Sequence, residues 1–251
     1  MTTDDMSLEA YLAQGGVLTS PANAPPRYRA EVMKIMARFV DSELAGAAGF
    51  ADVINAAPGL KERIAAARIV LEKTSHAEAV LTLMGEFGAN TARYAIHHPW
   101  AARLPRDTPP GALPSAHDMR LSVFTYPLQG WTDAVVMNLV MGLATGTQLG
   151  ELARVSYRPL AEAFTRIAPV EAAHVRLARE GIARLLAEGR GGEVDAALAY
   201  WRPRVAPVFG PDDPARFAHL SAMGLRHRPN AELRADWAET LDATLAELHP
   251  G

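Results

Sequence analysis

The sequence predicts an all-α protein built on four long helices. Apolar residues recur every three or four positions over long stretches, and no stretch of useful length alternates between apolar and polar residues. Proline and glycine fall where the periodic stretches begin and end. A chain of 251 residues with 49% hydrophobic content can bury one large core. We therefore expect a loose amino-terminal arm over residues 1–26 and a single helical domain over residues 27–250.

The long helices follow from the apolar pattern and the crossover between them follows from proline. The long helices are predicted at residues 28–48, 58–88, 127–157 and 159–188, and shorter ones at 193–208, 214–225 and 230–248. The inner stripe of the first helix is predicted to carry Val32, Ile35, Phe39 and Ala47. Five prolines interrupt residues 94–125, so this stretch is expected to be a long crossover. Four long helices with one long crossover between the second and the third form the topology of a ferritin-like bundle.

Composition excludes several classes of partner and cofactor. A formal net charge of −3 without blocks of like charge argues against nucleic acid or a membrane as the main partner. The absence of cysteine excludes disulfides, thiolate-held zinc and iron–sulfur clusters. The chain has no glycine-rich nucleotide loop, so we expect no flavin or NAD in it. The amino terminus does not have the pattern of a signal peptide, and we expect the protein to be cytoplasmic.

Polar residues that can bind metal fall on the inner faces of three predicted helices. The first helix places Glu43 there, the second Lys73 and His76, and the fourth Glu171 and His174. Charged groups at such positions are costly unless they are paired or bound to metal. A Glu-x-x-His pair such as Glu171 with His174 puts a carboxylate and an imidazole on one helix face, where both can bind iron or manganese. In the second helix, lysine stands where such a pair would have its carboxylate.

Each of these residues also has a structural interpretation. Lys73 could bury its methylene stem and keep its ammonium in water, and both histidines could be hydrogen-bonded core residues. Glu72 is turned about 100° around the helix from Lys73, so it could supply the missing carboxylate only if the helix were rotated or distorted.

Several segments, in the same order and at the same spacing, resemble the oxygenase subunits of phenylacetyl-CoA epoxidases and, more distantly, of benzoyl-CoA epoxidases. These segments are SELAG at 42–46, NAAPGLKERI at 55–64, the region of His76, TYPLQGWTDA at 125–134, SYRPLAEAF at 156–164, EAAHVRLAREG at 171–181 and YWRPRVAPVFGP at 200–211. The resemblance extends from about residue 28 to the end of the chain. It implies a ferritin-like di-iron fold and an oxygen-dependent monooxygenase.

The resemblance also implies which residues correspond to iron ligands. The family pattern has six ligands from four helices, and four of them match here: Glu43, His76, Glu171 and His174. Lys73 stands at the position of the second-helix glutamate, and Gly142 stands at that of the third-helix aspartate. Two ligands of the family pattern are therefore replaced.

The charge of the altered cluster disfavours two metal ions. Glu43, Glu171 and Lys73 sum to −1 when both histidines are neutral, so two divalent ions would leave a charge of +3 in a poorly solvated seam. One pair of like charges at 4 Å costs about 4 kcal/mol at an effective dielectric constant of about 20. We therefore expect either one ion, with iron as the candidate and some of Glu43, His76, Glu171 and His174 as ligands, or no metal, with Lys73 bridging the two glutamates.

These alternatives lead to three hypotheses about function. The first is an oxidoreductase that uses oxygen and acts on an aromatic or acyl-CoA substrate, either with two partners, a separate reductase and a structural subunit, or as a homodimer. The second is a metal-free enzyme in which Lys73, Glu43 and Glu171 are catalytic. The third is a non-catalytic structural subunit in which Lys73 forms a salt bridge with both glutamates.

Two further motifs have a functional and a structural interpretation. His97, His98, Arg103 and Arg106 form a basic loop that could bind the phosphates of CoA or could be a solvated surface. Glycines at positions 142, 146 and 150 are spaced as on the small-residue face of a closely packed helix.

Overall fold

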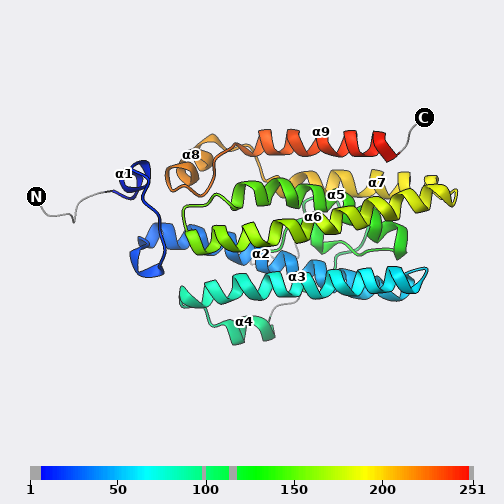
Figure 1. The fold of residues 1–251 in the computed structure, drawn as a ribbon, viewed down its shortest axis with the longest axis horizontal. Helices are drawn as coiled ribbons and strands as arrows, with labels where there is room; N and C mark the ends of the chain where they lie inside the picture. The colour runs from blue at the N-terminus through cyan, green and yellow to red at the C-terminus, as the bar shows by residue number, and fades with distance from the viewer. Residues whose placement is uncertain (1–6, 98–99, 113–117, 249–251) are drawn as a thin grey trace, which may run out of the picture.

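The computed structural model describes residues 7–97, 100–112 and 118–248, and within these ranges it is all-α (Figure 1). The α-helices are α1 (Leu8–Ala13), α2 (Pro26–Val53), α3 (Leu60–Glu86), α4 (Thr91–His97), α5 (Gly130–Leu152), α6 (Arg158–Ala187), α7 (Gly191–Val205), α8 (Pro214–Ala222) and α9 (Asn230–Leu248). Short 3-10 turns lie at Pro21–Asn23, Ile54–Ala56, Ser122–Thr125 and Ala206–Phe209. No helix in the described ranges combines the length and the apolar character needed to cross a bilayer.

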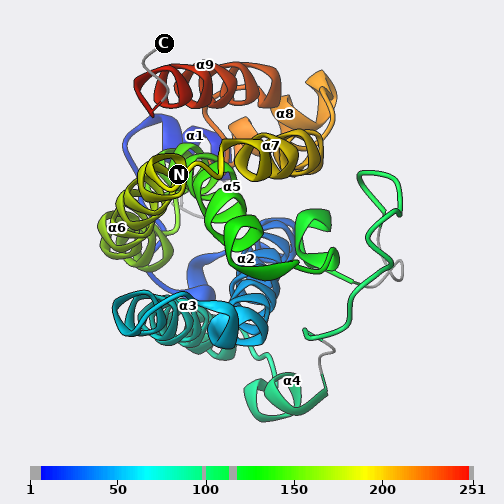
Figure 2. The ribbon, with the colours of Figure 1, turned by 90° about the vertical axis from the view of Figure 1, so that its right-hand side faces the viewer.

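The four long helices α2, α3, α5 and α6 form the predicted ferritin-like bundle, with the long connection between α3 and α5 (Figure 2). The most extensive contacts join α2 to α3 and α5 to α6, and α3 also packs against α6. Proline at the first turn of α2 and of α6 fixes a backbone angle that suits a helix start. The predicted inner faces of α3 and α6 are largely confirmed, since Ile69 and Val80 of α3 and Phe164 and Ile167 of α6 are buried.

The inner face of α2 differs slightly from the predicted stripe. Val32, Met36 and Val40 are fully buried, whereas Ile35 and Phe39 are only half-buried. The predicted stripe lies towards one edge of the buried face, because large apolar residues occur on that edge as well. Phe39 uses its position there to meet the ring of Phe164 edge-on, with 5.0 Å between centroids.

The predicted crossover contains structure that the sequence did not indicate. Helix α4 has seven residues, which is too few for a periodic apolar pattern to be recognised. The hydroxyl of Tyr94 in α4 donates a hydrogen bond to the buried carboxylate of Asp41 in α2. This tertiary contact holds the start of the connection against the bundle.

The segment expected to be a loose arm is packed against the bundle within its described part, residues 7–26. Leu18 is buried and forms an isolated parallel bridge with Tyr157, with hydrogen bonds from Leu18 N to Ser156 O (3.1 Å) and from Arg158 N to Leu18 O (2.8 Å). Such backbone pairing with a distant segment leaves no periodic signal in the sequence. Residues 1–6 lie outside the described ranges.

Helices α7 and α9 cover the side of α5 that faces away from α2 and α3 (Figure 2). Trp201 of α7 and Trp237 of α9 are buried, and the indole N–H of Trp237 donates to the carbonyl oxygen of Val140 at 3.0 Å. Because α5 is enclosed on nearly all sides, its residues from Thr132 to Gly142 are buried without interruption, and its sequence lacks a polar face.

Close packing of α5 on α6 depends on one glycine from each helix. A Cβ atom at Gly142 would lie 2.7 Å from Cγ2 of Val175, and a Cβ atom at Gly181 would lie 2.7 Å from Cγ1 of Val135. The predicted packing role of the glycine series thus applies to Gly142. It does not apply to the glycines at 146 and 150, where a Cβ atom would meet nothing within 4 Å.

Candidate functional site

The ammonium of Lys73 lies at the centre of the bundle between two carboxylates. Its Nζ donates to Oε1 of Glu43 at 3.1 Å and to Oε1 and Oε2 of Glu171 at 3.0 and 3.1 Å. The side chains of Lys73, Glu43 and Glu171 are 7%, 5% and 2% exposed, so the ammonium does not reach solvent. The interpretation of Lys73 as a side chain that keeps its head in water is therefore wrong.

His76 completes this cluster from the next turn of α3. Its Nδ1 lies 3.1 Å from Oε2 of Glu43 and 3.2 Å from Oε1 of Glu171. Lys73 and His76 thus approach the same two carboxylates from one helix, because residues three positions apart share a helix face. We refer to Glu43, Lys73, His76 and Glu171 as the ionic cluster.

The pKa values within the ionic cluster are set by a balance between burial and charge. Burial lowers the pKa of His76, but its hydrogen bonds to Glu171 and Glu43 outweigh burial and raise that pKa to about 9. Burial likewise lowers the pKa of Lys73, and the charges of Glu171 and Glu43 raise it above its ordinary value. Burial raises the pKa of Glu171, yet the positive charge of Lys73 and the neighbouring imidazoles hold it well below its usual range. At neutral pH the two cations therefore balance the two carboxylates.

His174 lies beside the ionic cluster and connects it to the outside of the bundle. Its Nδ1 is 3.4 Å from Oε2 of Glu171 without forming a hydrogen bond, and its Nε2 is 2.6 Å from Oε2 of Glu72. The carboxylate of Glu72 is 33% exposed. Glu72 is turned away from Lys73 around α3, as predicted. Because α6 packs against α3, the carboxylate of Glu72 contacts His174 of α6 instead.

Gly46 makes room for the long side chain of Lys73, which sequence reasoning missed. A Cβ atom at Gly46 would lie 3.5 Å from Cδ of Lys73 and 3.2 Å from Cε1 of Phe124. Contacts of 3.0–3.4 Å are tighter than nearly all real Cβ contacts, so a larger residue would press on Phe124 and crowd the lysine stem. The available signal was a glycine three residues after Glu43, on the same helix face.

Three of the predicted metal ligands have a geometry that could hold one ion. One ligand atom each from Glu43, His76 and Glu171 lies within 4.8 Å of the other two. Lys73, however, already donates to both of these carboxylates, and His76 already bonds to Glu43. Gly142, which the resemblance aligns with the third-helix ligand, has no side chain to bind an ion.

The residues present do not fit a di-iron centre in this arrangement. The repulsion between a divalent ion and the Lys73 ammonium at 4 Å is about 8 kcal/mol at an effective dielectric constant of about 20, before the attraction of the carboxylates is counted. A single ion fits only if Lys73 leaves its present position and His76 loses its proton.

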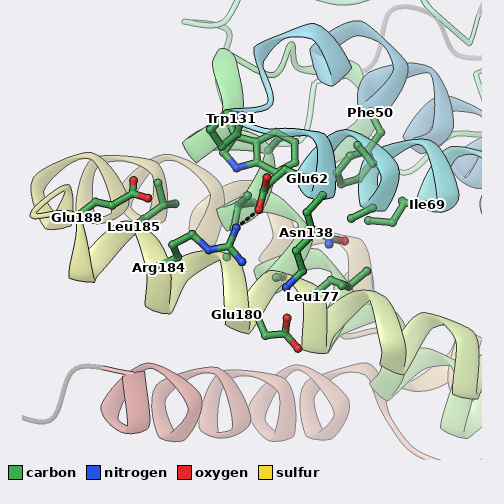
Figure 3. A pocket seen from close by; sticks show the side chains of 18 residues that line it. Phe50, Glu62, Ile69, Trp131, Asn138, Leu177, Glu180, Arg184, Leu185 and Glu188 are labelled. Carbon is green, nitrogen blue, oxygen red and sulfur yellow. Dashed lines mark hydrogen bonds and ion pairs between the residues drawn. The ribbon is translucent and has the colours of Figure 1, made fainter.

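A cleft between α3, α5 and α6 ends about one helical turn from this cluster (Figure 3). Phe50, Ile69 and Leu177 form apolar parts of its wall, and an ion pair between Arg184 and Glu62 crosses it. Ile69 lies one turn before Lys73 in α3. No residue of the ionic cluster lines the cleft, so it does not give a ligand direct access to the lysine.

The arginines of the predicted basic loop make contacts within the protein. Arg106 forms two hydrogen bonds of 2.8 Å with the carboxylate of Asp133, and its guanidinium lies 3.6 Å from the ring centroid of Tyr200. Asp133 also accepts a hydrogen bond from the indole of Trp201 at 2.8 Å. Arg103 donates to backbone oxygens, including that of Ala45 at 3.0 Å. Both arginines therefore bind within the protein and are only partly exposed, so the expectation of a solvated basic surface is wrong for them.

The two histidines predicted for this loop cannot be assigned a contact. His98 lies outside the described residues, as does the side chain of His97. Asp133 instead joins two of the segments that carry the family resemblance. It lies in segment 125–134 and accepts a hydrogen bond from Trp201 of segment 200–211. These residues attach the long connection to α5 and α7.

Comparison with known proteins agrees with the geometry of the bundle. The model of a family described as "Phenylacetic acid catabolic protein" matches residues 6–249. A curated relative, one of the subunits of 1,2-phenylacetyl-CoA epoxidase from Escherichia coli (strain K12), is 26% identical over 221 residues, which cover 84% of this chain and 64% of that protein. The chain thus spans less than two thirds of the length of that relative. Since the family model extends over nearly the whole sequence, the chain belongs to the phenylacetic acid catabolic protein family.

Proposed function

We propose that this chain is a metal-free component of a multi-subunit oxygenase of the phenylacetyl-CoA epoxidase kind. In this proposal the ionic cluster takes the place of a redox metal and stabilises the bundle. The observation that carries the proposal is the position of Lys73, whose ammonium is buried between the two carboxylates that would otherwise bind metal.

The charge balance of the ionic cluster supports this role. Two cations, Lys73 and protonated His76, face two carboxylates at distances of 3.0–3.2 Å. Such a group satisfies its own charges and hydrogen bonds, which is the condition under which buried ionic groups are tolerated. A site that prepares for metal would instead present excess negative charge and neutral imidazoles.

Participation in an oxygenase rests on the family and on the relative. The name of that relative describes it as one subunit of an epoxidase, so it works together with others. We propose that the present chain associates with a catalytic subunit that receives electrons from a reductase, and that the assembled enzyme acts on an aromatic or acyl-CoA substrate.

A second candidate is a mononuclear metal enzyme that uses the Glu43, His76 and Glu171 group. The convergence of their ligand atoms within 4.8 Å favours it. The hypothesis of a metal-free enzyme, in which Lys73 is a general base or amine nucleophile, has less support. Its ammonium donates to three carboxylate oxygens and has a raised pKa, whereas a nucleophilic lysine needs a lowered one.

Metal content after purification and after incubation with iron(II) under anaerobic conditions tests the proposal. The comparison uses the wild-type chain, Lys73→Met and Lys73→Glu, with iron and manganese measured by mass spectrometry and by the shift in unfolding temperature. Lys73→Glu restores the Glu-x-x-His pair of α3, and Lys73→Met removes the ammonium without adding a ligand.

The proposal predicts less than about one tenth of an ion per wild-type chain and a clear gain in Lys73→Glu, because affinity follows the number of charged ligands. About one tightly bound ion per wild-type chain, lost in His76→Ala, would overturn it in favour of the mononuclear enzyme. Oxygen consumption by the isolated wild-type chain with a reductant would also contradict it.

A further inference from the structure

The outer face of α3 carries an apolar stripe that no described part of the chain covers. Leu60, Ile64 and Leu71 are 74%, 52% and 67% exposed, and Ala67 between them is also exposed. The first three make up most of the large exposed hydrophobic residues in the described ranges. Figure 2 shows α3 at the edge of the bundle, with α2 and α6 on its inner side. We call these four residues the α3 stripe.

The spacing of the α3 stripe is that of a helix-pairing seam. Successive members are separated by four, three and four residues, which is the alternation of a heptad repeat. The stripe lies on the opposite side of α3 from Ile69 and Lys73, so it serves neither the core nor the ionic cluster. An exposed seam of this kind suits another amphipathic helix.

The exposed charges beside the α3 stripe are positive. Lys61 and Arg68 lie along one side of it and Arg63 along the other, and all three residues are exposed. The acidic residues of this half of α3 are directed elsewhere. Glu62 forms an ion pair with Arg184 of α6, and Glu72 bonds to His174.

This charge pattern disfavours a second copy of the chain as the occupant. Two copies in antiparallel register would pair Leu60 with Leu71 and Ile64 with Ala67. Each flank then meets the same flank of the other copy, which places Lys61 opposite Arg68 of that copy. Like charges across an interface select against that partner. An acidic partner helix would meet the same apolar stripe and pair with the same cations.

We propose that the α3 stripe binds an amphipathic helix of another protein, with an apolar face flanked by glutamate or aspartate. This inference rests on the proposed function, which supplies the identity of the partner as a further subunit. Metal content is independent of this surface, so a failure of the helix-binding test and a failure of the metal test are distinguishable.

Two synthetic helical peptides provide the probes. Both peptides have leucine at the two seam positions of each heptad. One has glutamate and the other lysine at the flanking positions, so like charges disfavour self-association of either peptide. Binding to the full chain is measured by fluorescence anisotropy at low and high salt. The variants are Ile64→Asp with Leu71→Asp, Arg63→Glu with Arg68→Glu, and Ile96→Asp as a control at an exposed apolar residue of α4.

The wild-type chain is expected to bind the glutamate peptide at least about 10-fold more tightly than the lysine peptide, with the difference shrinking at high salt. The double aspartate variant should weaken binding at least about 10-fold, the double glutamate variant should reverse the preference, and Ile96→Asp should change neither. Equal binding of both peptides would overturn the proposal. So would a wild-type homodimer, seen by sedimentation, that the double aspartate variant disperses. Circular dichroism of each variant excludes misfolding as the cause.

Discussion

Replacing Lys73 by methionine is expected to destabilise the protein strongly. Methionine keeps most of the buried stem, so the change removes the charge and its hydrogen bonds with little loss of volume. The ammonium lies 3.0–3.1 Å from oxygens of both Glu43 and Glu171. At this separation the gross attraction of each pair is about 5 kcal/mol at an effective dielectric constant of about 20.

The net effect is smaller than the sum of these attractions, because the buried ammonium is also costly to desolvate. Removing one partner of a buried ion pair costs about 3–5 kcal/mol. For a chain of this size the loss corresponds to a decrease in unfolding temperature of roughly 6–20 °C. His76 stays close to both carboxylates, and its positive charge limits the loss of stability. Below neutral pH, where this imidazole is protonated, we therefore expect a loss in the lower part of the range.

Denaturant unfolding followed by circular dichroism measures this change, with chelator present to exclude metal. The matched control combines Lys73→Met with Glu43→Gln and Glu171→Gln, which removes the unpaired negative charges. Because replacing a whole buried ionic group by neutral residues is often tolerated, this control should regain most of the stability. A loss below about 1 kcal/mol for Lys73→Met alone, the range of exposed ion pairs, would refute the reasoning.

Three further predictions concern other contacts. Since the folded-state pKa of His76 is about 9 and the unfolded value is about 6.5, its stabilisation is complete below pH 6.5 and is lost as pH rises through 9. Urea unfolding across this range should show a loss on the order of 2–3 kcal/mol that His76→Gln abolishes. Asp133→Ala should cost about 3–5 kcal/mol in the same assay, because it leaves Arg106 without its carboxylate, and an effect below about 1 kcal/mol would contradict the contacts. Gly142→Ala should lower stability by about 1–3 kcal/mol through the 2.7 Å approach to Val175, whereas Gly146→Ala should raise it by up to about 1 kcal/mol; equal effects would argue against close packing.

The sequence was sufficient to predict the bundle because the four long helices follow the apolar period closely. Lys73, Glu171 and His174 could be placed at buried positions for the same reason, since their neighbours at steps of three and four are apolar. A periodic pattern identifies the inner face of a helix but does not give the distance between two helices. The contact between Lys73 and Glu171 was therefore one of several open alternatives until the three-dimensional arrangement resolved it.

The features that sequence reasoning missed depend on contacts between distant segments. Helix α4 is short, and its contact with α2 through Tyr94 leaves no local pattern. Leu18 pairs with the backbone beside Tyr157 in the same way. The role of Asp133 in attaching the loop of Arg106 likewise requires three elements to meet, which no spacing along the chain can reveal.

The enclosure of α5 by α6, α7 and α9 limits how this protein can be shortened. A chain ending after α6 would keep every residue of the ionic cluster, yet it would uncover the apolar side of α5 that Trp201 and Trp237 now occupy. Such a fragment would expose a large hydrophobic surface and tend to aggregate. An expressed fragment should therefore include α7 and α9, even where only the chemistry of the buried lysine is of interest.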